Sequence, residues 1–345
     1  MMKFRTLPLV AGVLALAGLA SQSSPAGADD VADFYKGKTV TVVIAAGPGG
    51  SHTQYTQFLA PYLEKYMPGN PNFIIQNMGG AGGTKAANYL YNTAPQDGTA
   101  IGILLSDTPL ASRLRATGVK YDPSKFQFLG GADQPRSVFL VYKSEGVNSL
   151  ADAKEKEVIL GSTGKGSQTY VVPTLVNAML GTKFKVITGY RGMGGIYIAM
   201  DRQEVKGFQS SYDGAKSLKS EWFEKDLVTV LAVNALTPLP DAPNAPLLKD
   251  LVENPRDKEI ATLIGGNTVL GRGWLAPPGV PADRVAALRS AFEKAFADPE
   301  AVAAAKERKL AWDPVGWKEM QEHARRIAAA DADVIKGMTD ALGLN

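Results

Sequence analysis

Short apolar strands alternate with amphipathic helices along most of this chain, and no other feature constrains its fold as strongly. The run Thr39–Ala45 is β-branched and apolar, as expected of a buried strand. Residues 51–66 follow with apolar side chains at helical spacing, and residues 72–76 read as the next strand. Strands joined through helices form right-handed crossovers, so the sequence predicts an α/β fold with a mainly parallel sheet.

The alternation continues through a helix at 84–91 and a strand at 99–105, and it resumes near residue 137. Further strands are predicted at 137–142, 158–160, 184–188, 206–210 and 228–233, with helices at 169–180 and 195–204. The Pro-rich stretch Leu236–Pro246 indicates a linker. Helices are predicted beyond it at 281–296, 300–309 and 315–338.

The N-terminus has the pattern of a secretory signal peptide. Lys3 and Arg5 precede an apolar run of 14 residues from Leu7 to Ala20, and Ala26-Gly-Ala28 follows as a small-residue cleavage site. A membrane-spanning helix needs about 20 apolar residues, which makes an anchor the weaker interpretation. The sequence therefore predicts export through a cleavable signal peptide, with cleavage after Ala28.

Composition excludes several classes of protein. Removing residues 1–28 lowers the formal net charge from +3 to +1, so nothing favours nucleic-acid binding. The chain has no cysteine, which rules out disulfides, thiol catalysis and Cys-ligated metals. The remaining 317 residues exceed the usual size of one domain, so two domains are expected.

Two glycine-rich turns, Ala46–His52 and Asn77–Thr84, each join a predicted strand to a predicted helix. Glycines there let a ligand approach the backbone amides, and helix N-termini carry a partial positive charge. Two such ends at neighbouring strands predict an anion site. Ser51 is expected to cap its helix, with Gln54 completing a capping box. His52 either donates to an anionic ligand or has no special role.

A third glycine-rich turn, Gly161–Ser167, lies in the second series of strands and could meet the ligand from the opposite side. Tyr190 and Arg191 follow a later strand. Arg191 is either a ligand contact or a solvated or domain-bridging arginine.

Catalytic motifs are scarce. The chain contains neither a G-x-S-x-G elbow nor a phosphate-binding P-loop, and its two histidines are His52 and His323, the second expected at the surface. We therefore expect a binding protein rather than an enzyme, with no metal and no cofactor.

The chain resembles the tripartite tricarboxylate transporter substrate-binding proteins (TctC or Bug-type periplasmic receptors). The resemblance covers most of residues 29–345 in order. It is carried by Phe34–Ile44, Pro48-Gly-Gly, Gln76–Gly83, Ala94–Thr99, Tyr190-Arg-Gly, Leu231-Ala-Val, Leu239-Pro-Asp-Ala-Pro and Gly273–Pro281.

The resemblance implies a two-lobed periplasmic binding protein of type II, with the ligand cleft between the lobes. Residues 29–134 would form the first lobe, 135–236 the second, and 237–345 a mostly helical return to the first. The protein would be a monomer in the periplasm that passes a small organic anion to an integral-membrane permease. The family's first ligand loop corresponds to Pro48–Thr53, the second to Asn77–Gly83, and the contacts of the second lobe to Ser162–Ser167, Gln209 and Ser210.

The sequence departs from the family where acidic residues are common, because Thr53 and Gln209 stand there. A free amino group normally pairs with a carboxylate, so these losses favour a di- or tricarboxylate over an amino acid. A sensor for a membrane kinase and an enzyme acting on an anionic substrate are the alternatives. The predicted ligand-binding residues are Gly49, Gly50, Ser51, His52, Thr53, Asn77, Gly80, Ala81, Gly82, Gly83, Ser162, Thr163, Gly166, Ser167, Tyr190, Arg191, Gln209 and Ser210.

Overall fold

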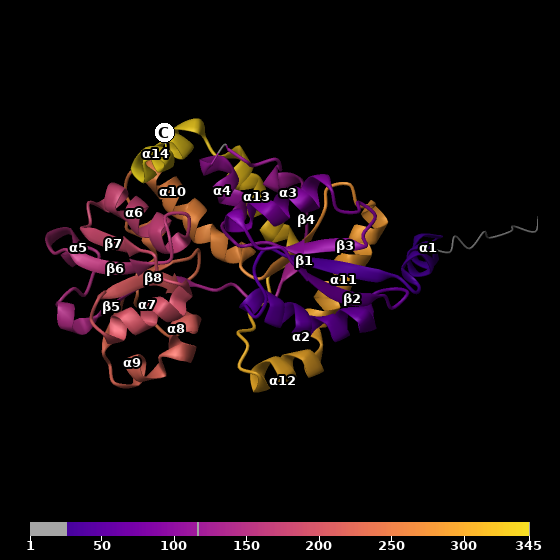
Figure 1. The fold of residues 1–345 in the computed structure, drawn as a ribbon, viewed down its shortest axis with the longest axis horizontal. Helices are drawn as coiled ribbons and strands as arrows, with labels where there is room; N and C mark the ends of the chain where they lie inside the picture. Colours follow the sequence, from indigo (N-terminus) through magenta and orange to yellow (C-terminus); the bar gives the residue numbers. More distant parts are fainter. Residues whose placement is uncertain (1–25, 116, 345) are drawn as a thin grey trace, which may run out of the picture.

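Two five-stranded sheets, each covered by helices, make up the computed structural model, which describes residues 26–115 and 117–344 (Figure 1). Most of the predicted signal peptide therefore lies outside the described residues. The first sheet has the strand order β2-β1-β3-β10-β4. Its strands are β1 (Thr39–Ile44), β2 (Asn72–Asn77), β3 (Ala100–Ile103), β4 (Gln127–Gly131) and β10 (Gly273–Ala276).

The second sheet has the strand order β7-β6-β8-β5-β9. Its strands are β5 (Ser137–Tyr142), β6 (Val158–Ser162), β7 (Phe184–Thr188), β8 (Gly207–Ser211) and β9 (Val228–Asn234). We call the first sheet with its helices the first lobe, and the second sheet with its helices the second lobe. The chain passes from the first sheet to the second between β4 and β5, and it returns between β9 and β10.

Both sheets are mixed, which corrects the expectation of a mainly parallel sheet. In the first sheet β1 is parallel to β2 and β3, but β10 is antiparallel to β3 and β4. In the second sheet β6 is parallel to β7 and β8, while β5 is antiparallel to β8 and β9. The strands that arrive from the other lobe, β5 and β10, run against their neighbours, because they do not enter through a local strand–helix–strand crossover.

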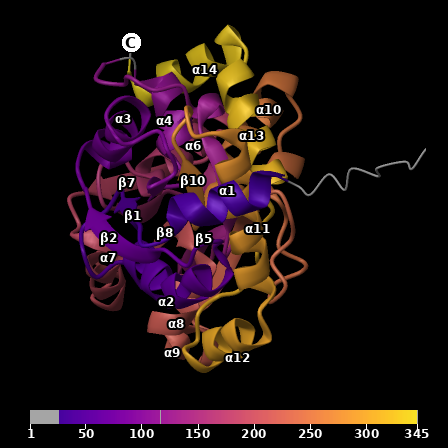
Figure 2. The ribbon, with the colours of Figure 1, turned by 90° about the vertical axis from the view of Figure 1, so that its right-hand side faces the viewer.

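Helices surround the first sheet on both faces. Among them, α2 packs on β2, and α11 packs on both α2 and β4. Figure 2 shows α1 against α11 on the outer side of this lobe. The helices of this lobe are α1 (Ala26–Tyr35), α2 (Ser51–Tyr66), α3 (Thr84–Asn92), α4 (Thr108–Leu114), α11 (Ala282–Ala297), α12 (Pro299–Glu307) and α13 (Trp317–Ala329).

The second sheet is covered by α6, which packs on β7 and β8, and by α7, which packs on β6. Two further helices, α10 and α14, lie between the lobes: α14 packs on α6 of the second lobe, on α4 of the first and on α10 (Figure 1). These helices are α5 (Asp152–Glu155), α6 (Gln168–Leu180), α7 (Gly192–Asp201), α8 (Tyr212–Leu218), α9 (Ser220–Glu224), α10 (Pro255–Gly266) and α14 (Ala332–Leu342).

The predicted helix at 315–338 is two helices, α13 and α14, with extended backbone at Ala330 and Asp331. No glycine or proline marks this break in the sequence. The break lets α13 pack on β4 of the first lobe while α14 packs on α6 of the second. Arg113 donates to the Ala330 carbonyl at 3.0 Å, which satisfies a backbone group that the break exposes.

The Pro-rich segment that follows β9 stays with the second lobe. Leu247 forms a bridge with Val233 of β9, and Leu239 is buried in the apolar cluster of the second sheet. Residues 237–247 therefore pack beyond the predicted lobe boundary at residue 236, because their apolar side chains have a surface of the second sheet to cover.

Gly69, in the turn between α2 and β2, meets α1 closely. It has a φ of +79°, and an added Cβ would lie 2.3 Å from the Ala32 carbonyl oxygen. We expect Gly69→Ala to lower the free energy of unfolding by about 2–4 kcal/mol, from backbone strain and a steric clash together. The control is Gly181→Ala, where φ is +72° and an added Cβ meets nothing within 4 Å. Urea unfolding should show a loss of only about 1 kcal/mol there; equal losses would contradict the clash.

Candidate ligand-binding cleft

A cavity of about 360 Å³ lies between the lobes, at the ends of strands from both sheets. A hollow of about 690 Å³ beside β9 is larger, but it lies on the second lobe alone. The cleft cavity is lined by Ser51, His52, Leu105, Ser106, Asp107, Pro135, Ser137, Thr163, Ser167, Gln168, Thr169, Gly192, Met193, Ser210, Ser211, Thr268, Gly271 and Arg272.

The wall from the first lobe begins at the turn between β1 and α2. Gly49 has a φ of +81°, a conformation that favours glycine, and it brings the chain into α2. Ser51 and His52, in the first turn of α2, line the cavity. The N-cap is Gly50 and no side chain caps the helix, so the predicted capping box is wrong: Ser51 is already helical. The uncapped first-turn amides leave partial positive charge at this wall.

Thr53 and Asn77 join the two glycine-rich turns and do not line the cavity. Thr53 is buried, and its hydroxyl accepts from the Asn77 side-chain amide at 3.0 Å. The same amide donates to the Ala46 carbonyl at 3.2 Å. The turns are thus held together by polar side chains, which fixes the position of the α2 N-terminus.

The second glycine-rich turn lies outside the cavity lining in this structure. Its backbone takes left-handed values of φ at Ala81 (+47°), Gly82 (+59°) and Gly83 (+88°). An added Cβ at Gly82 would lie 3.5 Å from Arg115, and one at Gly83 would lie 2.6 Å from the Thr108 hydroxyl. A ligand contact stays a prediction for two sets of residues. They are Asn77, Gly80, Ala81, Gly82 and Gly83 in this turn, and Gly49, Gly50 and Thr53 in and after the first turn.

The wall from the second lobe is formed by hydroxyl groups of the turn between β6 and α6. Thr163 donates from its hydroxyl to Ser167 at 2.9 Å, and its backbone amide donates to the Thr169 hydroxyl at 3.1 Å. Ser162 is fully buried and bonds Thr169 at 2.9 Å, so it supports the turn. Thr163, Ser167 and Thr169 line the cavity at the N-terminus of α6.

Ser210, near the end of β8, lines the cavity from the same lobe, and its contact with a ligand stays a prediction. Its neighbour Gln209 is fully buried, and neither of its side-chain polar atoms has a partner among the described residues. The start of α7 contributes Gly192 and Met193 to the lining, whereas Tyr190 and Arg191 just before it do not line the cavity. Gly166 lines an adjacent cavity instead.

Arg272, which was not predicted from the sequence, lines the cavity between the lobes. Its guanidinium forms an ion pair with the buried Asp133 and lies 4.7 Å from the ring centre of Tyr55. Burial raises the pKa of Asp133 to about 6, although Arg272 opposes the rise. The pair is separated by 139 residues in sequence, so no local pattern could have indicated it.

His52 is a neutral side chain at physiological pH. Burial and the nearby Arg272 charge lower its pKa to about 4. It can therefore act as a hydrogen-bonding group toward a ligand but not as a cation. His323 is also buried, at 6% exposed, with its pKa lowered to about 4 chiefly by burial. The expectation of a surface position for His323 was wrong, because α10 packs on α13 where this side chain lies.

Asp107 is a second cleft residue that was not predicted from the sequence. It follows β3 and lines the cavity, and burial raises the pKa of its carboxyl to about 6, with Arg115 opposing the rise. No other side chain in the described ranges bonds to this carboxylate. The stretch Ser106-Asp107-Thr108-Pro109 at the end of a parallel strand was the signal that could have located it.

Metal centres and membrane spans are both absent from the part of the chain that the structure describes. Residues 26–115 and 117–344 place no group of three or more His, Asp or Glu where it could hold a metal ion. No helix within the same described ranges is long and apolar enough to span a bilayer.

Comparison with solved structures finds the same architecture in solute-binding proteins. A TctC solute-binding protein from Polaromonas is 17% identical, with a TM-score of 0.68 over 90% of this chain and 98% of that chain. MatC from Rhodopseudomonas palustris with bound malate is 19% identical, with a TM-score of 0.60 over 88% of this chain and 99% of that chain.

An R. palustris protein with adipate is 21% identical, with a TM-score of 0.62 over 87% of this chain and 97% of that chain. No protein-family model matches the chain, and no curated protein matches it in sequence. The chain therefore has the two-lobed α/β fold of the periplasmic solute-binding proteins.

Proposed function

We propose that this protein is an exported receptor that captures a small organic carboxylate in the cleft between its lobes. The observation that carries the proposal is that two helix N-termini, those of α2 and α6, open onto one cavity from opposite lobes. Each contributes unpaired amides and partial positive charge, which suit an anion without requiring a dedicated lysine or arginine.

The hydroxyls around the cavity fit the same ligand class. Ser51 in the first lobe faces Thr163, Ser167 and Ser210 in the second, so a bound carboxylate could accept hydrogen bonds from both lobes. Such bonds would form together only when the lobes are closed around the ligand. The malate and adipate named for two proteins of the same fold support this ligand class.

We propose further that the receptor delivers its ligand to the integral-membrane permease of a tripartite transporter. Support comes from the chain-long resemblance to TctC and Bug-type receptors and from the TctC protein among the structures of the same fold. A receptor rather than an enzyme is favoured because no hydroxyl of the described cleft lining is hydrogen-bonded to a histidine or a carboxylate. Thr163 and Thr169 bond to Ser167, and the Nε2 atom of His52 has no partner among the described residues.

Asp107 changes the kind of carboxylate that the cleft is expected to hold. The preference for a di- or tricarboxylate over an amino acid rested on the acidic residues replaced by Thr53 and Gln209. The cleft nevertheless contains a carboxylate, at Asp107. A negative charge on the ligand would be repelled close to Asp107, so the proposal is a ligand whose carboxylate lies away from Asp107.

Calorimetric titration of purified protein with matched pairs of acids and their neutral amides tests this function. We expect the acid of at least one pair to bind, and its amide to bind at least tenfold more weakly, because the amide lacks the charge that the helix N-termini favour. Equal affinity for acid and amide, or binding restricted to neutral and cationic solutes, would refute the carboxylate receptor.

The pH dependence of binding follows from Asp107. Its pKa of about 6 means that it is mostly ionised at pH 7.5 and mostly neutral at pH 5. His52 stays mostly neutral across this range. We therefore expect an anionic ligand to bind several-fold more tightly at pH 5 than at pH 7.5. Titration of Asp107→Asn at both pH values should reduce this difference and leave only the part that comes from Asp133, which pairs with Arg272 and also has a pKa of about 6. An unchanged dependence would assign it to another group.

A further inference from the structure

A second chamber of about 320 Å³ adjoins the cleft between the lobes. Asp107 and Gln168 line both cavities, so the two cavities meet at these residues. This volume falls within the range of small-molecule sites.

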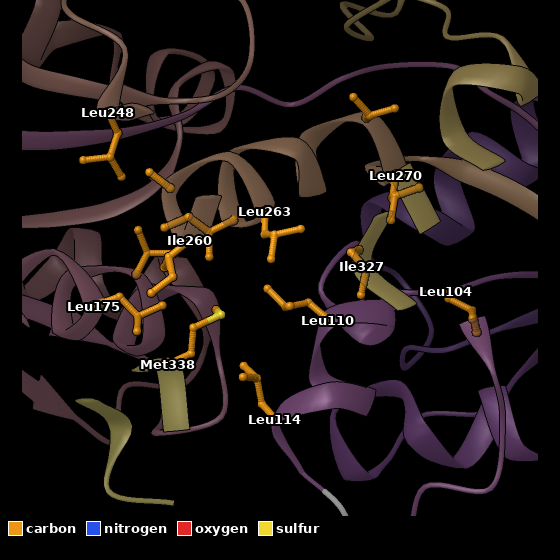
Figure 3. Packing of buried hydrophobic residues seen from close by; sticks show 14 of the residues in the cluster. Leu104, Leu110, Leu114, Leu175, Leu248, Ile260, Leu263, Leu270, Ile327 and Met338 are labelled. Carbon is orange, nitrogen blue, oxygen red and sulfur yellow. The ribbon is translucent and has the colours of Figure 1, made fainter. Parts of the chain in front are cut away.

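The walls of the chamber are mostly apolar. Leu110 and Leu114 of α4 face Val172 of α6 and Ile264 of α10, and all four side chains are at most 8% exposed. Figure 3 shows Leu110 and Leu114 in one buried cluster with Leu263 of α10 and Met338 of α14, although Leu263 and Met338 do not line the chamber. A polar ligand would gain little from these walls, whereas an apolar one would be removed from water.

Polar groups stand at the edges of the chamber. Gln168 donates to the Ser106 hydroxyl at 3.0 Å, and Arg115 donates to the Gly166 carbonyl at 2.8 Å, so both pairs join the lobes. Asn267 is 4% exposed, and its side-chain oxygen has no partner within the described chain. A water molecule or a hydroxyl on the ligand would supply the missing donor.

We infer that the receptor binds carboxylates with an apolar body: the carboxylate lies in the polar cleft, and an alkyl chain or aromatic ring occupies the second chamber. This inference rests on the proposed function, because it places the charged group of the same ligand in the cleft. A cleft built only for short polar diacids would not select carboxylates with an apolar body.

Calorimetric titration with butanoate, hexanoate and octanoate tests the inference on the unmodified protein. Each methylene that enters the chamber should tighten binding by about fourfold, until the chamber is full. Affinity that does not rise from butanoate to octanoate would overturn the inference while leaving the carboxylate receptor intact. Absence of binding by every acid, short or long, would overturn both.

A variant that fills the chamber tests whether the dependence of affinity on chain length arises there. Ala111 of α4 lines the chamber and does not line the cleft. In Ala111→Phe we expect octanoate to bind no more tightly than butanoate, while butanoate keeps its affinity and so reports an intact cleft. Ala111→Ser, which leaves the chamber open, should keep the full dependence on chain length. A dependence that persists in Ala111→Phe would place the alkyl chain elsewhere.

Discussion

Replacing Ser210 by Trp is expected to reduce carboxylate affinity by about a hundredfold or more, a loss of at least ~2.7 kcal/mol in binding free energy. Ser210 lines the cleft near the end of β8, and an indole there would occupy much of a cavity of about 360 Å³. It would also keep the second lobe from closing on the α2 N-terminus. Calorimetric titration of the variant measures the loss.

The matched control is Ser217→Trp. Ser217 is exposed on α8 and lies outside the cleft lining, so the same indole should change affinity by less than about twofold and leave stability within ~0.5 kcal/mol. A circular dichroism spectrum of each variant checks that both remain folded. If folded Ser210→Trp binds as well as the unmodified protein, the ligand does not lie in this cleft.

Replacing Arg272 by Met is expected to lower the free energy of unfolding at pH 7.5 by about 3–5 kcal/mol, because it leaves the buried Asp133 carboxylate without its partner. The Asp133 side chain is only 3% exposed, so water cannot compensate. Guanidinium unfolding measures the loss. The double variant Arg272→Met with Asp133→Leu should recover most of it, since the uncompensated charge is then gone.

The loss of unfolding free energy in Arg272→Met should depend on pH. Asp133 has a raised pKa in the folded protein, about 6, so the folded state binds its proton more readily than the unfolded state does. Without Arg272 the carboxylate becomes more costly to ionise. The destabilisation by Arg272→Met should therefore shrink as the pH falls from 7.5 to 5, where Asp133 can bind a proton.

Arg136→Met is the control for this second prediction. Arg136 pairs with Asp313 at 2.9 Å, but the Asp313 side chain is 45% exposed, and exposed pairs contribute little. A loss of about 1 kcal/mol or less is expected. If Arg136→Met and Arg272→Met destabilise the protein equally, burial of Asp133 is not the reason for the effect.

Local patterns in the sequence predicted the parts of the fold that are themselves local. The strand Thr39–Ile44, the helix Ser51–Tyr66 and the turn between β6 and α6 each carry their own signal of apolar spacing or glycine. These are also the parts that, with β8, supply Ser51, His52, Thr163, Ser167 and Ser210 to the cleft lining. Strand ends followed by glycine-rich turns therefore indicate the position of the cleft from the amino-acid sequence alone.

The features that depend on contacts between distant segments could not be predicted in this way. The break at Ala330, the antiparallel β10 and the burial of His323 all follow from packing between distant elements, which leaves no periodic pattern in one segment. The Arg272–Asp133 pair could not be predicted for the same reason, because its two residues lie at the ends of different strands. Asp107 was an exception, because its position after the third strand did carry a readable signal.

A crystal structure of the protein with the tightest-binding acid from the titrations would test the central claim most directly. We predict that the carboxylate lies between the first turn of α2 and the hydroxyls of Thr163, Ser167 and Ser210, within hydrogen-bonding distance of both lobes. An acid found at another surface, or one held in this cleft with its carboxylate directed away from both helix N-termini, would contradict it.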